Sequence, residues 1–373
     1  GSYSLTEQHT LRAGFAFVDE KVSADSTTTV FPVDPAGNPT GAAFAIADDE
    51  SLHGLFAGAY LQDEWKLVPG LTLNFGARFD VFRSSFDDED QLSPRVNLIY
   101  KPNHSTTLHA GYARYFTPPP VENVTGSTVA QFDGTSNQSA ITQDDPVRAE
   151  RSDYLDAGIS QKLASGLQVG LDGYYKSAKD QLDDGLFGQT LILSAFNYAK
   201  GEIYGLELSS SFTRGSFTAY LNLAHSVAKG EDWNSSQFLF DPADLAYVKN
   251  HSIFLDHDQA LTGSFGSSYH WDHAKGATRV YLDALYGTGL RTDAEAPDGS
   301  NIPNGGTVPA YYTVSVGGEQ TFRIGDGRSW KLRVDILNIT DNSYELRDGT
   351  GVGVNAAQYG MRRGFFGSAA YSF

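Results

Sequence analysis

The stretch LTLNFGARFDV, at residues 71–81, decides the fold class of this chain. Every second residue from Leu71 to Val81 is apolar, and the residues between them include Asn74, Arg78 and Asp80. Successive side chains of a β-strand point to opposite faces of its sheet. The stretch therefore predicts a strand with one apolar face and one polar face.

The same alternation recurs along the chain and predicts fourteen strands in all. They lie at residues 8–21, 54–66, 71–84, 91–101, 106–117, 150–163, 167–179, 201–213, 216–228, 259–270, 277–290, 309–322, 328–340 and 359–373. All of them exceed the roughly 5–6 residues that are usual in soluble sheets. About 9–11 residues suffice for a tilted strand to cross a membrane. The lengths favour a membrane barrel over a soluble sandwich or propeller.

The connections between these strands alternate between short and long. The short ones, rich in Gly, Pro, Asn and Asp, lie at 69–70, 102–105, 165–166, 214–215, 272–276 and 325–328. The long ones include 22–52, 118–148, 229–256 and 291–308, and further strand could lie in 22–52 or in 189–197. Short periplasmic turns and long extracellular loops are typical of outer-membrane barrels, and an even strand number places both ends of the wall on the short-turn side.

The predicted fold class is all-β, a transmembrane antiparallel up-and-down β-barrel that forms a single domain over residues 1–373. Trp65, Tyr100, Trp271 and Trp330 lie near predicted strand ends, where interfacial aromatic girdles occur. The sequence has no apolar run of about 18 residues, so it predicts no transmembrane helix.

Charge and composition narrow the classes of partner. The formal net charge is −18, with 27 Lys and Arg against 45 Asp and Glu, so nucleic acid, which requires clustered cations, is a poor candidate partner. The chain has no cysteine, and therefore neither disulfides nor thiolate metal ligands. Part of the acidic excess lies at residues 87–90. We interpret it as solvated loop charge, with divalent-cation binding as the less favoured alternative.

Four internal segments and the carboxyl end resemble, in order, the C-terminal half of TonB-dependent receptor barrels. The internal segments are LSPRVNLIY at 92–100, GYARYFTPP at 111–119, GEIYGLEL at 201–208 and LNITDNSYE at 337–345. The chain ends in Tyr371-Ser372-Phe373, similar to the terminal aromatic signal that the barrel-assembly machinery reads in this family. Each motif is weak alone, but their number and order make the resemblance specific.

The resemblance implies an outer-membrane transporter that imports a scarce ligand of the siderophore, vitamin or saccharide class. No segment resembles the plug domain or the TonB box of the family, and fourteen strands are fewer than the 22 of such transporters. We therefore expect either the barrel region of a longer receptor or a smaller barrel. TonB is an expected partner only if a plug exists upstream, and the ligand is not identified.

Charged residues inside the predicted strands are candidates for the lumen lining. A lipid-facing Arg or Lys near the bilayer midplane costs about 2–4 kcal/mol, so these side chains should face inward. The candidates are Arg78, Asp80, Asp172, Lys176, Asp283, Arg333 and Asp335. Cross-strand ion pairs that hold the wall are the favoured interpretation, and a solute path is the alternative.

Aromatic residues of the long loops are candidates for ligand capture, although they could equally pack within ordered loops. They are Phe132, Trp233, Phe238, Phe240 and Tyr247. Tyr371 and Phe373 are the candidate assembly signal. Expected surroundings are outer-membrane lipid, lipopolysaccharide and the barrel-assembly machinery.

No catalytic constellation is recognisable, so we expect no enzyme, and we assign no cofactor and no metal. His270 and His273 flank a predicted short turn, where a solvated turn is favoured over a metal site. Two other functions remain open at this point. They are passive diffusion through a plugless pore and glycan binding by a soluble extracellular β-protein.

Overall fold

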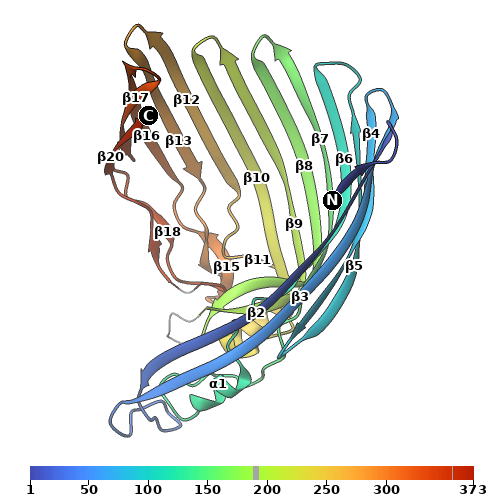
Figure 1. The fold of residues 1–373 in the computed structure, drawn as a ribbon. Coiled ribbons are helices and arrows are strands. Elements are labelled where there is room, and N and C mark those ends of the chain that lie inside the picture. The colour runs from blue at the N-terminus through green and yellow to red at the C-terminus, as the bar shows by residue number, and fades with distance from the viewer. Residues whose placement is uncertain (188–192, 355) are drawn as a thin grey trace.

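One continuous antiparallel sheet dominates the computed structural model, which describes residues 1–187, 193–354 and 356–373. Its described strands number sixteen, and each long strand pairs with the neighbours that precede and follow it in the sheet. The sheet curves along its width, and its hairpin turns lie together at one end (Figure 1). The up-and-down order confirms the predicted fold class.

Fourteen of these strands are long and match the fourteen predicted ones. They are β2 (His9–Val30), β3 (Phe44–Val68), β4 (Leu71–Ser84), β5 (Asp88–Tyr100), β6 (Thr106–Thr117), β7 (Glu150–Ala164), β8 (Leu167–Leu186), β9 (Leu193–Arg214), β10 (Phe217–Trp233), β12 (Leu261–His273), β13 (Gly276–Gly287), β16 (Tyr311–Gly325), β17 (Arg328–Leu337) and β20 (Gly364–Ser372). The other two, β1 (Ser2–Ser4) and β11 (Ile253–Phe254), pair with β2 and β10.

The predicted loop 22–52 is mostly strand in the structure. β2 continues to Val30 and β3 begins at Phe44, with Val30 paired to Phe44. This ribbon extends beyond the part of the wall where a lipid face is needed, so its sequence does not have to alternate. Residues 193–197 belong to β9. Residues 188–192 lie outside the described part of the chain.

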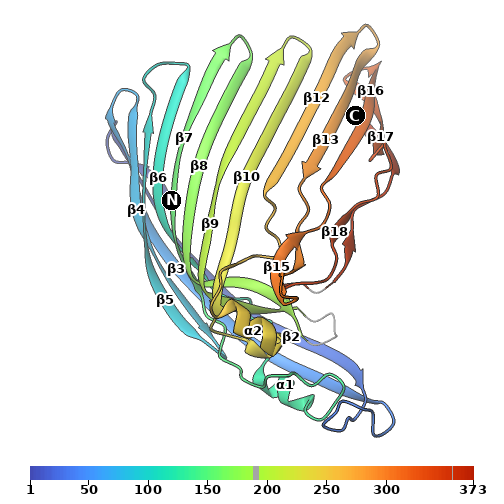
Figure 2. The same ribbon diagram turned by 180° about the vertical axis from the view of Figure 1, so that it is seen from behind.

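The other long connections also contain secondary structure that alternation did not predict. They hold two short hairpins, β14 (Arg291–Glu295) with β15 (Asn301–Thr307) and β18 (Glu345–Arg347) with β19 (Gln358–Tyr359). They also hold α1 (Gly126–Gln131), α2 (Pro242–Val248) and the 3-10 turn η1 (Gln237–Leu239). Figure 2 shows α1 and α2 at the end opposite the hairpin turns, which we call the outer end.

Among the described residues, no helix is long and apolar enough to span a membrane.

The described strands form an open wall. β20 pairs with β17, and within the described residues no pairing joins it to β1 or β2. β2 begins and β20 ends beside the short turns, as the even strand number predicts, because His9 pairs with Trp65 and Ser372 pairs with Ser329.

Candidate functional site

The register of the sheet places all seven candidate lumen residues on one face, which we call the polar face. Residues paired across antiparallel strands share a face. Arg78 pairs with Ser93 on β5, so these two residues lie on the same face. Following the pairs from strand to strand places Asp335 on β17 on that face as well. The alternate residues, such as Phe79 and Leu171, lie on the opposite face and are about half exposed.

The polar face is the one against which the outer loops fold. Val121, from the segment between β6 and β7, packs with Leu52 of β3 and Phe82 of β4. Leu52 and Phe82 share the parity of Arg78 on their strands. This face therefore points into the barrel, and loops cover it at the outer end.

Arg78 and Asp80 form an ion pair within β4. Arg78 Nε lies 2.5 Å from Asp80 Oδ1, and the Asp80 residue is 3% exposed. Gly58 on the neighbouring β3 leaves the space for this pair, since a Cβ there would overlap both side chains. The pair compensates a buried carboxylate that would otherwise be costly.

The β6–β8 part of the wall holds a three-strand charge group. His109 Nε2 lies 3.2 Å from Asp156 Oδ2 and 3.1 Å from Asp172 Oδ1. Lys176 Nζ lies 2.6 Å from Glu150 Oε1 on β7. These contacts join neighbouring strands, as expected for residues that stabilise a wall.

The remaining candidates lie on β13 and β17. The Tyr220 hydroxyl donates to Asp283 Oδ1 at 3.2 Å. Arg333 Nε lies 2.8 Å from Asp335 Oδ2, and the Tyr281 hydroxyl also donates to Asp335. All seven candidates thus contact other residues of the wall. The side chains of Asp172 and Arg333 keep 39% and 49% exposure and could also meet a solute.

Two hydrophobic clusters order the outer loops. The Phe132 cluster consists of Val30, Val129, Phe132, Phe187 and Phe238. The Trp233 cluster consists of Phe196, Tyr198, Ala228, Trp233, Phe240, Val248, Ile253, Leu255 and Val352. Each cluster combines residues from wall strands and from connections, so the loops are packed against the end of the wall.

The five loop aromatics lie in or against these clusters. Phe132 is 2% exposed and contacts Phe187 edge to face, with ring centroids 5.2 Å apart. Trp233 and Phe240 stack at 4.3 Å with an interplanar angle of 2°. Tyr247 packs against the Trp233 cluster. Of the five, Phe238 and Phe240 also line a pocket.

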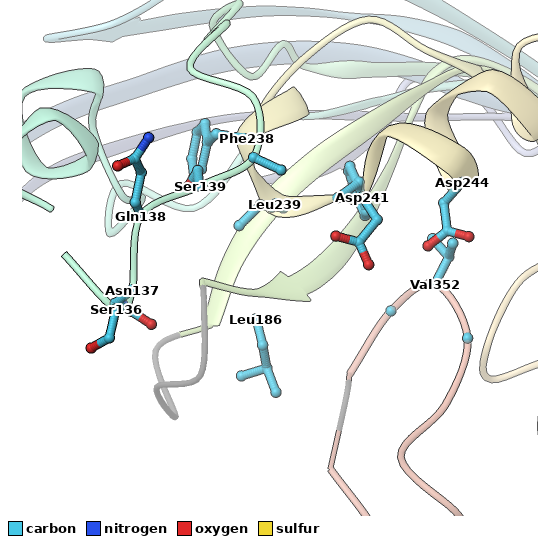
Figure 3. A pocket seen from close by; sticks show the side chains of 14 residues that line it. Ser136, Asn137, Gln138, Ser139, Leu186, Phe238, Leu239, Asp241, Asp244 and Val352 are labelled. Carbon is cyan, nitrogen blue, oxygen red and sulfur yellow. The ribbon is translucent and has the colours of Figure 1, made fainter. Parts of the chain in front are cut away.

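That pocket, which we call the outer pocket, has a volume of about 330 Å³. Figure 3 shows residues 136–139 on one side of it and Asp241 and Asp244 on the other. Its lining is Ser136, Asn137, Gln138, Ser139, Ala140, Leu186, Phe238, Leu239, Phe240, Asp241, Asp244, Gly351, Val352 and Gly353. Sequence alternation gave no signal for residues 136–140 and 351–353, because they form irregular loops.

The outer pocket is acidic. Its described lining includes Asp241 and Asp244 but neither Lys nor Arg. Burial raises the pKa of Asp244 to about 6, and the neighbouring carboxylates of Asp293 and Asp241 add to the shift. The pocket can accept hydrogen bonds through carboxylate and amide oxygens, and it disfavours anions. The pattern Asp241-Pro242, typical of a helix start, could have located α2 from the sequence.

His270 and His273 do not form a joint site. Both belong to β12, where an odd separation places them on opposite faces of the sheet. His270 Nε2 lies 3.4 Å from Asp272 Oδ2, whereas the His273 ring contacts Gln320. The metal alternative for this pair is therefore wrong, because strand geometry separates the two rings.

The carboxyl end is accessible at the short-turn side of the wall. Tyr371 lies against Trp330, with ring centroids 5.0 Å apart, and Phe373 is 97% exposed.

Comparison with known proteins identifies a family and a relative that this chain resembles. The family model described as "TonB dependent receptor-like, beta-barrel" matches residues 1–339. The probable TonB-dependent siderophore receptor PirA of Acinetobacter baumannii is 22% identical over 385 residues, which cover 97% of this chain and 48% of that protein. The chain thus spans about half the length of this relative.

Solved structures share the fold. The siderophore receptor PiuA from Acinetobacter baumannii superposes with a TM-score of 0.65 at 14% identity, covering 100% of this chain and 54% of that one. The FrpB iron transporter from Neisseria meningitidis, F3-3 variant, gives the same values. The receptor FpvA from Pseudomonas aeruginosa PAO1, bound to pyoverdine, gives 0.65 at 14% identity, covering 100% and 51%.

These likenesses agree with the wall geometry, and the family model spans most of the chain. The chain belongs to the TonB-dependent receptor-like β-barrel family of the bacterial outer membrane.

Proposed function

We propose that this chain supplies the barrel wall and outer loops of a receptor that imports a siderophore-type ligand, without catalysing a reaction. The outer pocket is the observation that carries the proposal. Packed loops at the outer end of the polar face form a small polar cavity of about 330 Å³. The relative PirA is described as a probable siderophore receptor.

The charge of the outer pocket indicates which part of a ligand fits it. Asp241 and Asp244 accept hydrogen bonds and repel anions. The proposed ligand therefore presents hydroxyl, amide or amine donors to this pocket, while Phe238 and Phe240 offer apolar contact. Ligands rich in free carboxylates are disfavoured.

Growth on supplied ligands tests import. A strain that lacks the whole receptor gene would be complemented with wild type and grown under iron limitation on hydroxyl- and amine-rich or carboxylate-rich ferric siderophores. We expect TonB-dependent growth on the first group. Growth that does not require TonB would contradict import, and so would a failure to grow on any of the ligands tested.

Two substitutions test the pocket within the same receptor. Asp241→Asn with Asp244→Asn is expected to weaken binding of the transported ligand at least tenfold, because charge-assisted hydrogen bonds are lost. Asp298→Asn, at an exposed site outside the pocket, is the matched control. Equal affinity of wild type and the double variant would refute the role of the pocket.

The other functions suggested by the sequence make different predictions. A passive pore would show a large steady conductance in planar bilayers, whereas packed outer loops predict a small one. A soluble glycan-binding protein does not fit a chain of an outer-membrane family.

The proposed partners follow from the two faces and the carboxyl end. The apolar face would contact membrane lipid and lipopolysaccharide. The barrel-assembly machinery would read Tyr371 and the exposed Phe373. TonB becomes a partner in this proposal only through a plug upstream of the barrel.

A further inference from the structure

A second polar cavity lies at the outer end, where three segments meet. Asp183 comes from the outer part of β8, Asp256 and His257 from the connection between β11 and β12, and Arg347 from β18. All four line a cavity of about 330 Å³. Asp183 is sixteen residues along β8 from Leu167, or roughly 50 Å at the strand rise, and so lies beyond the membrane band of about 25 Å.

Three of these side chains present ligand atoms to one another. His257 Nδ1 lies 3.0 Å from Asp256 Oδ1 and 3.7 Å from Asp183 Oδ1. One ligand atom from each residue lies within 4.8 Å of the other two. Bond lengths of about 2.0–2.2 Å in a tetrahedral zinc site separate ligand atoms by about 3.4 Å. Small side-chain movements would therefore close this group around one cation.

Asp183 gives an independent sign that this group is a ligand site. Its side chain is 7% exposed, and its Oδ2 is buried with no hydrogen-bond partner among the described residues. Its Oδ1 accepts the backbone N–H of Asp184 at 2.9 Å. A buried carboxylate oxygen without a donor is costly, and burial raises the pKa of Asp183 to about 7.

Neighbouring groups fix the Asp256 carboxylate. The Arg347 guanidinium and the Val354 backbone N–H, the latter at 3.0 Å, donate to Asp256 Oδ2. The other oxygen, Oδ1, remains on the side of His257. With the imidazole in the neutral form that binds a cation, two carboxylates against one guanidinium give a formal charge of −1 before the exposed Asp184 is counted.

We propose that Asp183, Asp256 and His257 bind one divalent cation of the zinc type. The mixture of one imidazole nitrogen and two carboxylate oxygens suits such a cation better than Ca²⁺ or Mg²⁺, which take oxygen ligands. Water would complete the coordination. Arg347 acts as a positioning residue that orients the Asp256 carboxylate.

The cation would tie the outer part of β8 to the β11–β12 connection. It would also steady the segment that follows Gly353, because Asp256 accepts from Val354. Gly351, Val352 and Gly353 line the outer pocket. The cation site therefore braces one side of the outer pocket. This inference does not depend on which ligand the receptor imports.

Zinc titration of the whole receptor, purified in detergent and treated with chelator, tests the site. With a competing fluorescent zinc indicator, we expect one Zn²⁺ per chain at micromolar affinity. Asp183→Asn and His257→Gln should each weaken binding tenfold or more, since loss of even an outer ligand partner commonly costs about 10–100-fold. Asp298→Asn and His251→Gln, an aspartate and a histidine that do not line this cavity, are the controls and should bind as wild type.

Two further measurements make the test decisive. Heat-modifiable migration checks that each variant is folded, and Co²⁺ substitution should give a visible absorption band that His257→Gln abolishes. Absence of binding at millimolar Zn²⁺, equal affinity in all variants, or tighter binding of Ca²⁺ would each overturn the proposal. Zinc binding is measured independently of ligand uptake. A failed import experiment would therefore not overturn the proposed cation site.

Discussion

At the scale of single residues, glycines in the wall make room for charged pairs. Gly58 faces Arg78 and Asp80, and Gly158 faces His109 and Asp172 in the same manner. At both places the charged side chains occupy the space that the glycine on the facing strand leaves free.

Gly58→Ala is expected to destabilise the wall by about 1–3 kcal/mol, because the new methyl group forces Arg78 and Asp80 out of their pairing. Thermal unfolding in detergent, followed by heat-modifiable migration, measures the loss. Gly318→Ala is the matched control, since the nearest heavy atom there lies 3.9 Å from the added Cβ. An equal effect of both changes would contradict this account.

Asp244 predicts a pH dependence of the outer pocket. Its folded-state pKa, about 6, lies above the value of 3.8 for an unperturbed carboxyl. The folded loop therefore binds the proton more tightly than the unfolded loop, which stabilises the fold at low pH. This stabilisation is present below about pH 4 and is lost as the pH rises through about 6.

Hydrogen exchange of α2, corrected for the intrinsic pH dependence, measures this effect. Protection should be greater at pH 5 than at pH 7.5, and Asp244→Asn should remove the difference. A wild-type pH dependence that persists in the variant would assign the effect to another group.

At the scale of elements, the sequence predicts the strands well and the loops poorly. The alternation around Arg78 predicts β4 because one face meets lipid and the other meets water. No such demand acts on α2 or on the β14–β15 hairpin, whose positions depend on contacts with distant strands. Trp233 and Phe240 stack on each other, which is the packing that the sequence left open beside ligand capture, and Phe240 also lines the outer pocket.

Phe240→Ala is expected to loosen this loop core by about 3–5 kcal/mol, the usual cost of removing a buried aromatic side chain. Limited proteolysis should then cut residues 234–252 faster, while the strands stay protected. Phe240→Leu, which keeps most of the volume, should be cut more slowly than the alanine variant. Unchanged cleavage in both would show that the stack does not order the loop.

At the scale of the whole molecule, the two faces of the wall determine how it sits in the membrane. Leu171→Arg places a charge on the apolar face, about four residues from the short turn and within the lipid band. We expect a loss of about 2–4 kcal/mol and reduced assembly. Asn222→Arg, on the polar face, should be tolerated. The folding yield of each variant in lipid vesicles measures the difference. A lower yield for Asn222→Arg than for Leu171→Arg would show that the two faces have been assigned the wrong way round.

The sequence by itself determined the wall of this protein, its two faces and its family, because lipid and water impose a period of two on every spanning strand. The tertiary structure alone decided what lies at the outer end. The outer pocket joins residues 136–140, 241–244 and 351–353, and the proposed cation site joins Asp183 to His257. These residues are far apart in the chain and follow no period, so only the packing of the loops against the polar face brings them together.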